Sequence, residues 1–147
     1  MAEEGSDPAP IIAPMRGLHL TADLRGCAAA RPLMTDAAAL RSTCLGAVAA
    51  AGLTPIGEIF HRFEPGATAR SGAPTGITGV VLLAESHLAV HTWPEIAAAT
   101  LDVYVCNLGA DNSARAEAVL AALIDAFAPA SVERHALQRG VDAVAAP

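Results

Sequence analysis

The chain has 147 residues, which is enough for one domain with a buried core. The net charge is −6, and 53% of the residues are hydrophobic against 16% charged, so a disordered chain is excluded and a nucleic-acid partner is not expected. All nine basic residues are arginine, and the absence of lysine excludes chemistry on a lysine Schiff base, including pyridoxal phosphate in its usual attachment.

The N-terminal segment, the apolar stretches and the cysteines indicate in which compartment the protein is found. Residues 1–15 combine prolines with acidic residues, which predicts a disordered tail and not a signal peptide, with one domain over residues 16–147. No apolar stretch has the length needed to cross a bilayer, so no membrane partner is expected. Cys27, Cys44 and Cys106 match neither a disulfide framework nor a CxxC metal motif, which favours reduced thiols in the cytoplasm.

The first elements follow from hydrophobic periodicity. Residues 17–24 alternate between apolar and polar side chains, which predicts a strand with one buried face. A helix is expected over residues 36–51, capped by Thr35 or Asp36. Cys44 falls on the apolar stripe of this helix and is expected in the core.

Four more strands are expected in the middle of the chain. They cover residues 56–63, 77–84, 87–93 and 100–106. The run over 77–84 is almost continuously apolar, which is typical of a buried strand. The segment over 64–75 is rich in glycine, proline and hydroxyl residues and predicts a loop that is long for a compact domain, as functional loops often are.

A second helix and a last strand complete the order. The helix is expected to begin at Asp111, Asn112 or Ser113 and to end near Phe127. Residues 131–139 can form a final strand. The order β-α-β-β-β-β-α-β predicts an α+β two-layer sandwich, with an antiparallel sheet and two helices on one face.

Reactive side chains concentrate in residues 84–95, directly after the most apolar run of the chain. Polar groups at the end of a buried strand are costly to hold there, which favours a site, although satisfied polar residues near a core are the plainer interpretation. His87 and His91 are separated by about 13 Å of strand, too far to share one metal ion. Ser86 lacks the flanking glycines of a nucleophile elbow, so a serine hydrolase is not favoured.

The string Ala-Glu-Ser-His-Leu-Ala-Val-His-Thr-Trp-Pro-Glu over residues 84–95 resembles the signature of the bacterial and archaeal S-adenosylmethionine decarboxylases. These are self-processing, pyruvoyl-dependent enzymes of polyamine synthesis. The similarity extends in order over about residues 16–140. It includes Gly-Leu-His-Leu at 17–20, Phe-His-Arg-Phe at 60–63 and Leu-Asp-Val-Tyr-Val-Cys at 101–106.

The resemblance implies a proenzyme that cuts its own chain between Glu85 and Ser86. The Ser86 hydroxyl attacks the Glu85 carbonyl, and elimination leaves one chain of residues 1–85 and one of residues 86–147. The second chain would begin with a pyruvoyl group derived from Ser86, which forms a Schiff base with the substrate amine. The implied enzyme is a carboxy-lyase that converts S-adenosylmethionine to decarboxylated S-adenosylmethionine plus CO2 for spermidine biosynthesis.

The resemblance also implies roles for individual residues, with no metal among the cofactors. Cys106 matches the proton donor of catalysis, and His91 with Thr78 matches the pair that assists processing. Phe63 matches the aromatic residue that stacks on adenine, and Glu95 the carboxylate that holds the ribose hydroxyls. The family forms homodimers whose active sites take residues from both chains.

Some positions depart from the family pattern. Thr78 stands where serine is usual, Asn107 where glycine is usual, and residues 96–99 replace a segment that bears tyrosine and glycine. Because these changes touch the region that would contact substrate, a pyruvoyl-dependent ornithine or arginine decarboxylase of the same fold remains an alternative. A non-catalytic homologue that stays uncleaved and acts as a binding or regulatory protein is another.

Local alternatives remain for four residues. Phe63 could be an ordinary core residue, and Glu95 a solvated residue after a proline. Trp93 is expected to pack and not to contact substrate. Asp102 shares a strand face with Cys106, so it could tune that thiol or only accept backbone hydrogen bonds.

Overall fold

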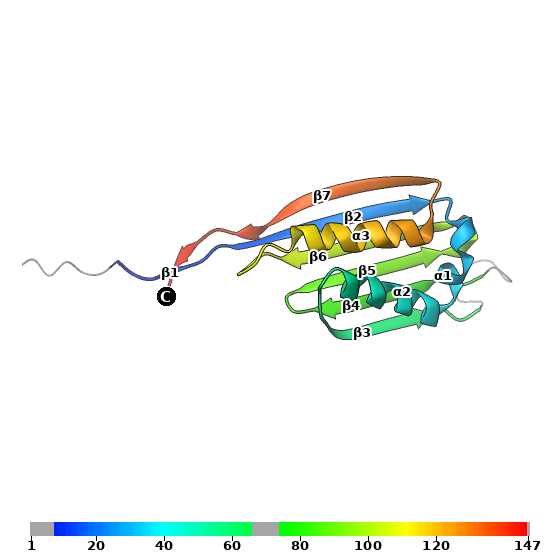
Figure 1. The fold of residues 1–147 in the computed structure, drawn as a ribbon, viewed down its shortest axis with the longest axis horizontal. Helices are drawn as coiled ribbons and strands as arrows, with labels where there is room; N and C mark the ends of the chain where they lie inside the picture. Colours follow the sequence, from blue (N-terminus) through cyan, green and yellow to red (C-terminus); the bar gives the residue numbers. More distant parts are fainter. Residues whose placement is uncertain (1–7, 66–73, 147) are drawn as a thin grey trace, which may run out of the picture.

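A six-stranded antiparallel sheet forms the centre of the protein in the computed structural model, which describes residues 8–65 and 74–146 (Figure 1). The strand order is β3-β4-β5-β6-β2-β7. The strands are β2 (Met15–Arg25), β3 (Pro55–Arg62), β4 (Ile77–Leu83), β5 (Ser86–Trp93), β6 (Ala98–Cys106) and β7 (Ser131–Val141). The expected order of elements is confirmed, while most of the expected loop over 64–75 lies outside the described residues.

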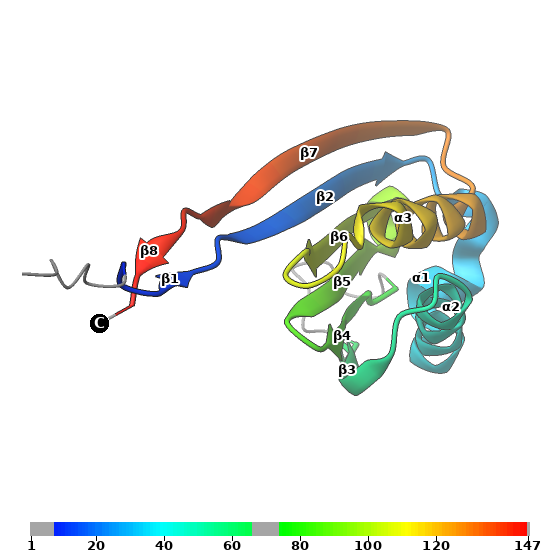
Figure 2. The same ribbon diagram turned by 60° about the vertical axis from the view of Figure 1, so that its left-hand side comes forward.

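Two long helices cover the same face of the sheet (Figure 2). They are α2 (Ala37–Ala50) and α3 (Ser113–Phe127). Three short helical elements complete the set: η1 (Ala28–Ala30) and α1 (Arg31–Thr35) before α2, and η2 (Pro94–Ile96) between β5 and β6. Asp36 caps α2, because its carboxylate accepts hydrogen bonds from the N–H groups of Ala38 and Ala39. This arrangement confirms the α+β two-layer sandwich.

The core lies between the sheet and these helices. Every second residue of the central strands points into it, as the period of two requires. The helices contribute their apolar stripes, including Cys44 at the position expected for it. The largest fully buried side chains include Phe127, Leu20, Leu24, Met34, Leu40, Ile77, Leu88, Leu101, Leu120 and Leu123.

Within the part of the chain that the structure describes, no helix covers the second face of the sheet, and we call it the open face. The expectation that the run over 77–84 is buried is met on one side only, since Leu82 is 48% exposed while Val81 and Leu83 are buried. The reason is that both long helices lie on the other side of β4. Strand register places all five histidines on the open face, together with exposed Ile59, Leu82, Trp93 and Leu137.

A two-stranded ribbon extends β2 and β7 beyond the ends of the other strands (Figures 1 and 2). It consists of β1 (Ile11–Ile12) paired antiparallel with β8 (Val144–Ala145). The expected disordered tail over residues 1–15 therefore contains a short strand, while residues 1–7 lie outside the described residues. Among the described helices, none has the length and apolar content to cross a membrane.

Candidate functional site

The peptide bond between Glu85 and Ser86 lies in a tight turn. Leu83 pairs with Ser86, so Ala84 and Glu85 alone connect β4 to β5. Glu85 has a φ of 57°, in the left-handed region that usually holds glycine or asparagine. For a residue with a Cβ this conformation costs roughly 1 kcal/mol, so the turn holds backbone strain at this bond.

Ser86 and Cys106 are neighbours in space although they are 20 residues apart in the chain. The Cys106 backbone N–H donates to the Ser86 Oγ at 3.1 Å. Cys106 ends β6 and is buried, and its carbonyl accepts a hydrogen bond from the Asn112 side chain at 2.9 Å. Asn112 is also the N-cap residue of α3, so the start of this helix fixes the position of Cys106.

Thr78 and His91 form a second pair on the open face. They are directly opposite each other on β4 and β5, and the Thr78 hydroxyl shares a hydrogen bond of 3.1 Å with His91 Nδ1. The His91 ring also lies 6.1 Å from the ring of Trp93. A hydroxyl bonded to an imidazole can relay a proton, which suits acid–base chemistry.

The two pairs are at opposite ends of β5. His91 follows Ser86 by five residues in the strand, which corresponds to about 17 Å of strand length. One chain therefore does not bring the Thr78–His91 pair to Ser86. Two hollows, of about 420 and 310 Å³, open elsewhere on the described surface, and neither is lined by Ser86, Cys106 or His91.

Phe63 and Glu95 lie at the His91 end of the sheet. The Phe63 N–H donates to the Gly76 carbonyl at 3.0 Å, which holds the residue beside the start of β4. Its side chain is 41% exposed, so the alternative that Phe63 is an ordinary core residue is wrong. Glu95 is exposed in η2, immediately after β5, and Trp93 is exposed beside it.

A histidine and aromatic cluster occupies the middle of the open face. His19 Nε2 lies 3.0 Å from the Asp102 carboxylate, and the His87 ring lies 6.4 Å from His19 and 5.6 Å from Tyr104. The guanidinium of Arg139 lies 5.5 Å from the centre of the Tyr104 ring. Burial, with the nearby charge of His19, lowers the pKa of His87 below its ordinary value of 6.5, which favours the neutral imidazole.

This cluster corrects the two roles considered for Asp102. Its carboxylate pairs with His19 and not with the Cys106 thiol or the backbone. The alternation of residues 17–24 does put His19 on the polar face of its strand. The sequence does not show that β2 pairs with β6. This pairing places Thr21 opposite Asp102 and His19 opposite Tyr104.

Within residues 8–65 and 74–146, no group of three or more His, Cys, Asp or Glu side chains is placed to hold an ion. The chemistry available at the two pairs is that of a hydroxyl, a thiol and an imidazole.

Comparisons with family models, with individual proteins and with solved structures all match the chain to the same family. The family described as S-adenosylmethionine decarboxylase matches residues 18–140. The chain is 36% identical over 125 residues to the S-adenosylmethionine decarboxylase proenzyme of Aquifex aeolicus, covering 85% of this chain and 82% of that one. It is 32% identical over 124 residues to the proenzyme of Archaeoglobus fulgidus, covering 84% and 97%. The crystal structure of the adenosylmethionine decarboxylase from Aquifex aeolicus matches with a TM-score of 0.72 at 33% identity, covering 88% of this chain and 94% of that one.

Proposed function

Because the chain belongs to the S-adenosylmethionine decarboxylase family, we propose that it is a self-processed, pyruvoyl-dependent enzyme that converts S-adenosylmethionine to decarboxylated S-adenosylmethionine and CO2 for spermidine biosynthesis. One observation carries this proposal beyond family membership. The Ser86 hydroxyl lies at a strained turn, beside a buried cysteine, in a chain that has no lysine to hold a carbonyl cofactor as a Schiff base.

The chain's own residues can carry out the cleavage. The Ser86 Oγ attacks the Glu85 carbonyl carbon, and the peptide bond becomes an ester between the two residues. Removal of the Ser86 Cα proton then breaks the Cβ–O bond, releases the Glu85 carboxylate and leaves dehydroalanine. Water adds to this group, ammonia leaves, and the chain of residues 86–147 begins with a ketone. The hydrogen bond from the Cys106 N–H orients the Ser86 Oγ and leaves its hydroxyl proton free for a base.

The surroundings of Ser86 fit the pyruvoyl group that this cleavage would produce. When formed, that group supplies an electron sink for the loss of CO2 from an amino acid. Cys106 is the acid that we assign to the reaction, because it is the last residue of a rigid strand and is held against Ser86 through its own N–H. The small exposed fraction of Cys106, 8%, keeps water from competing for the proton it donates.

We further propose a homodimer in which each site is shared. The separation of about 17 Å keeps Ser86 from the Thr78–His91 pair within one chain. Two open faces packed around a two-fold axis perpendicular to the strands bring the Ser86 end of one copy over the His91 end of the other. Thr78 and His91 then serve processing of the other copy, and Phe63 and Glu95 bind its substrate. The exposed apolar residues of the open face would be buried by the same contact.

Co-expression of two inactive variants tests the shared site. A Ser86→Ala chain keeps its Thr78–His91 pair, and a His91→Ala chain keeps its Ser86. Each alone is expected to remain a single chain, or in the case of His91→Ala to cleave slowly. In mixed dimers, intact-mass measurement is expected to find the His91→Ala chain cleaved, because the other copy supplies the imidazole. If mixing leaves the cleavage of the His91→Ala chain unchanged, the proposal that two copies share each site is wrong.

Carboxyl-labelled substrates test the reaction itself. We expect labelled CO2 from S-adenosylmethionine and none above background from ornithine or arginine. The reason is that the exposed Phe63 ring and Glu95 carboxylate suit the adenine and ribose of an adenosyl group. Release of CO2 from ornithine or arginine instead would favour the alternative pyruvoyl-dependent decarboxylases. The three cysteines are free thiols, which fits a reducing compartment, and we place the enzyme in the cytoplasm.

A further inference from the structure

We propose that the ribbon of β1 and β8 is an arm that packs on a second copy of this chain, against the hollow beside Trp93 and Ile96. The inference rests on the homodimer proposed above. The arm itself, residues 8–14 and 142–146, lies outside the residues 18–140 that the family matches. The residues that match the family therefore do not account for the arm.

The arm is apolar and uncovered. Ile11 is 74% exposed, and Ile12 and Val144 are also exposed. Neither residues 8–14 nor residues 143–146 include a charged side chain. A two-stranded ribbon is marginally stable in water by itself, so this segment gains order by packing on another surface.

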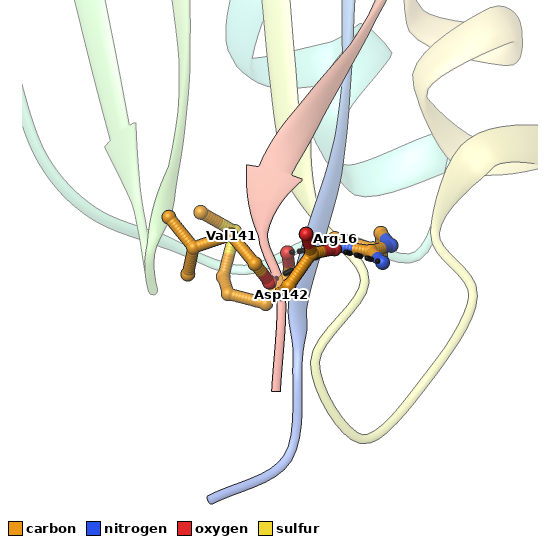
Figure 3. Close-up of polar contacts among 4 residues, drawn as sticks. Arg16, Val141 and Asp142 are labelled. Atoms are coloured by element: carbon orange, nitrogen blue, oxygen red, sulfur yellow. Dashed lines mark hydrogen bonds and ion pairs between the residues drawn. The ribbon is translucent and has the colours of Figure 1, made fainter. Parts of the chain in front are cut away.

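Hydrogen bonds and one close backbone contact at the base of the arm fix the direction in which it leaves the sheet. The Arg16 guanidinium donates to the Val141 carbonyl and to the Asp142 carboxylate, at 3.0 Å in each case (Figure 3). Gly140, with a φ of 150°, lies opposite Arg16, and a Cβ there would lie 2.1 Å from the Met15 carbonyl oxygen. Only glycine fits this close approach, so the strands leave the sheet at a defined angle.

The sheet topology decides where the arm points. Strands β2 and β5 are both antiparallel to β6, so they run in the same direction. The arm precedes β2 and therefore projects from the end of the sheet that carries Ser86. In the proposed dimer this end lies over the His91 end of the second copy.

A receiving surface lies at that His91 end. The hollow of about 310 Å³ has a mainly apolar lining with two charged residues and one hydroxyl residue at it: Asp23, Leu24, Arg25, Trp93, Ile96, Ala98, Ala99 and Thr100. Trp93 is 39% exposed and Ile96 67%, so both have surface left to bury. Pro10 and Pro14 flank β1 and lack N–H groups, which favours side-chain packing over the addition of a further strand.

Cross-linking between copies tests the arm directly. Chains with Ile12→Cys and chains with Ile96→Cys are co-expressed and oxidised, and each variant alone is the control. Within one chain the two positions lie at opposite ends of β2, which spans about 33 Å, so no disulfide can join them without linking two copies. Because Ile12 is in the fragment of residues 1–85 and Ile96 in that of residues 86–147, the expected product on a non-reducing gel is one fragment of each kind joined by a disulfide. We expect this species only when both variants are present, and reduction should separate it into the two fragments.

Sedimentation at equilibrium gives a second measurement. The double variant Ile11→Glu and Ile12→Glu is expected to raise the dissociation constant of the dimer by about tenfold or more, since two apolar side chains lose their burial. Ala121→Glu adds charge on the exposed outer face of α3 and is expected to leave the constant unchanged.

The outcomes separate the two proposals. A wild-type protein that sediments as a monomer overturns the homodimer and the arm together. A wild-type dimer with no Ile12–Ile96 cross-link and an unchanged dissociation constant overturns the arm alone and leaves the shared site standing.

Discussion

Ser86→Ala is expected to leave one uncleaved chain of 147 residues and no decarboxylation above background. Alanine has no hydroxyl to attack the Glu85 carbonyl, so neither the new chain end nor the ketone can form. Intact-mass measurement should find fragments of residues 1–85 and 86–147 in the wild type and a single full-length mass in the variant. Release of labelled CO2 reports the activity of the same samples.

A matched serine makes this result specific. Ser42 is exposed on α2, away from the site, and Ser42→Ala is expected to cleave and react as the wild type does. Cleavage of the Ser86→Ala chain at the same bond would show that another group is the nucleophile. A wild-type chain that remains in one piece would favour the non-catalytic homologue.

Cys106→Ala should separate processing from catalysis. The hydrogen bond to Ser86 Oγ comes from the backbone N–H of residue 106, which alanine retains, so the chain is expected to cleave. The thiol proton is lost, and the rate of decarboxylation is expected to fall by about 10²- to 10⁴-fold, the usual contribution of a positioned acid. The measurement is kcat from labelled CO2, on material shown by mass to be fully cleaved.

Cys44 provides the control for removing a thiol. It is buried in the core on α2, where burial raises the pKa of its thiol to about 12, so it stays protonated and unreactive. Cys44→Ala is expected to cost stability of about 1 kcal/mol through the small cavity it leaves, with an unchanged kcat per folded enzyme. An unchanged kcat for Cys106→Ala would remove Cys106 from the role of acid.

The proposed sharing of the site between two copies would account for the reactive and apolar side chains on the open face. Its exposed Trp93 and Leu82 are poorly suited to permanent contact with water. The almost continuous apolar run over residues 77–84 predicts burial on both faces of β4, and one chain supplies burial on one. The proposed second copy supplies the other, so the same contact would complete the core of β4 and the active site.

The sequence by itself determined the elements and the local chemistry. Periods of two and of about 3.6 residues are local properties, so the central strands, both long helices and the Asp36 cap could be predicted. The resemblance of residues 84–95 to the family signature implies Ser86 as the nucleophile, and this remains a proposal. The exposure of Phe63 could not be read in this way, because a strand end next to a loop has no periodic signal.

Only the tertiary structure decided which of these groups meet. The neighbours Ser86 and Cys106, the pairing of His19 with Asp102 and the hydrogen bond between Thr78 and His91 all depend on strand order and register. The ribbon of β1 and β8 joins the two ends of the chain, and no local pattern predicts such a pairing. Contacts between segments far apart in sequence depend on how the whole sheet assembles, and that assembly also puts both long helices on one face of the sheet.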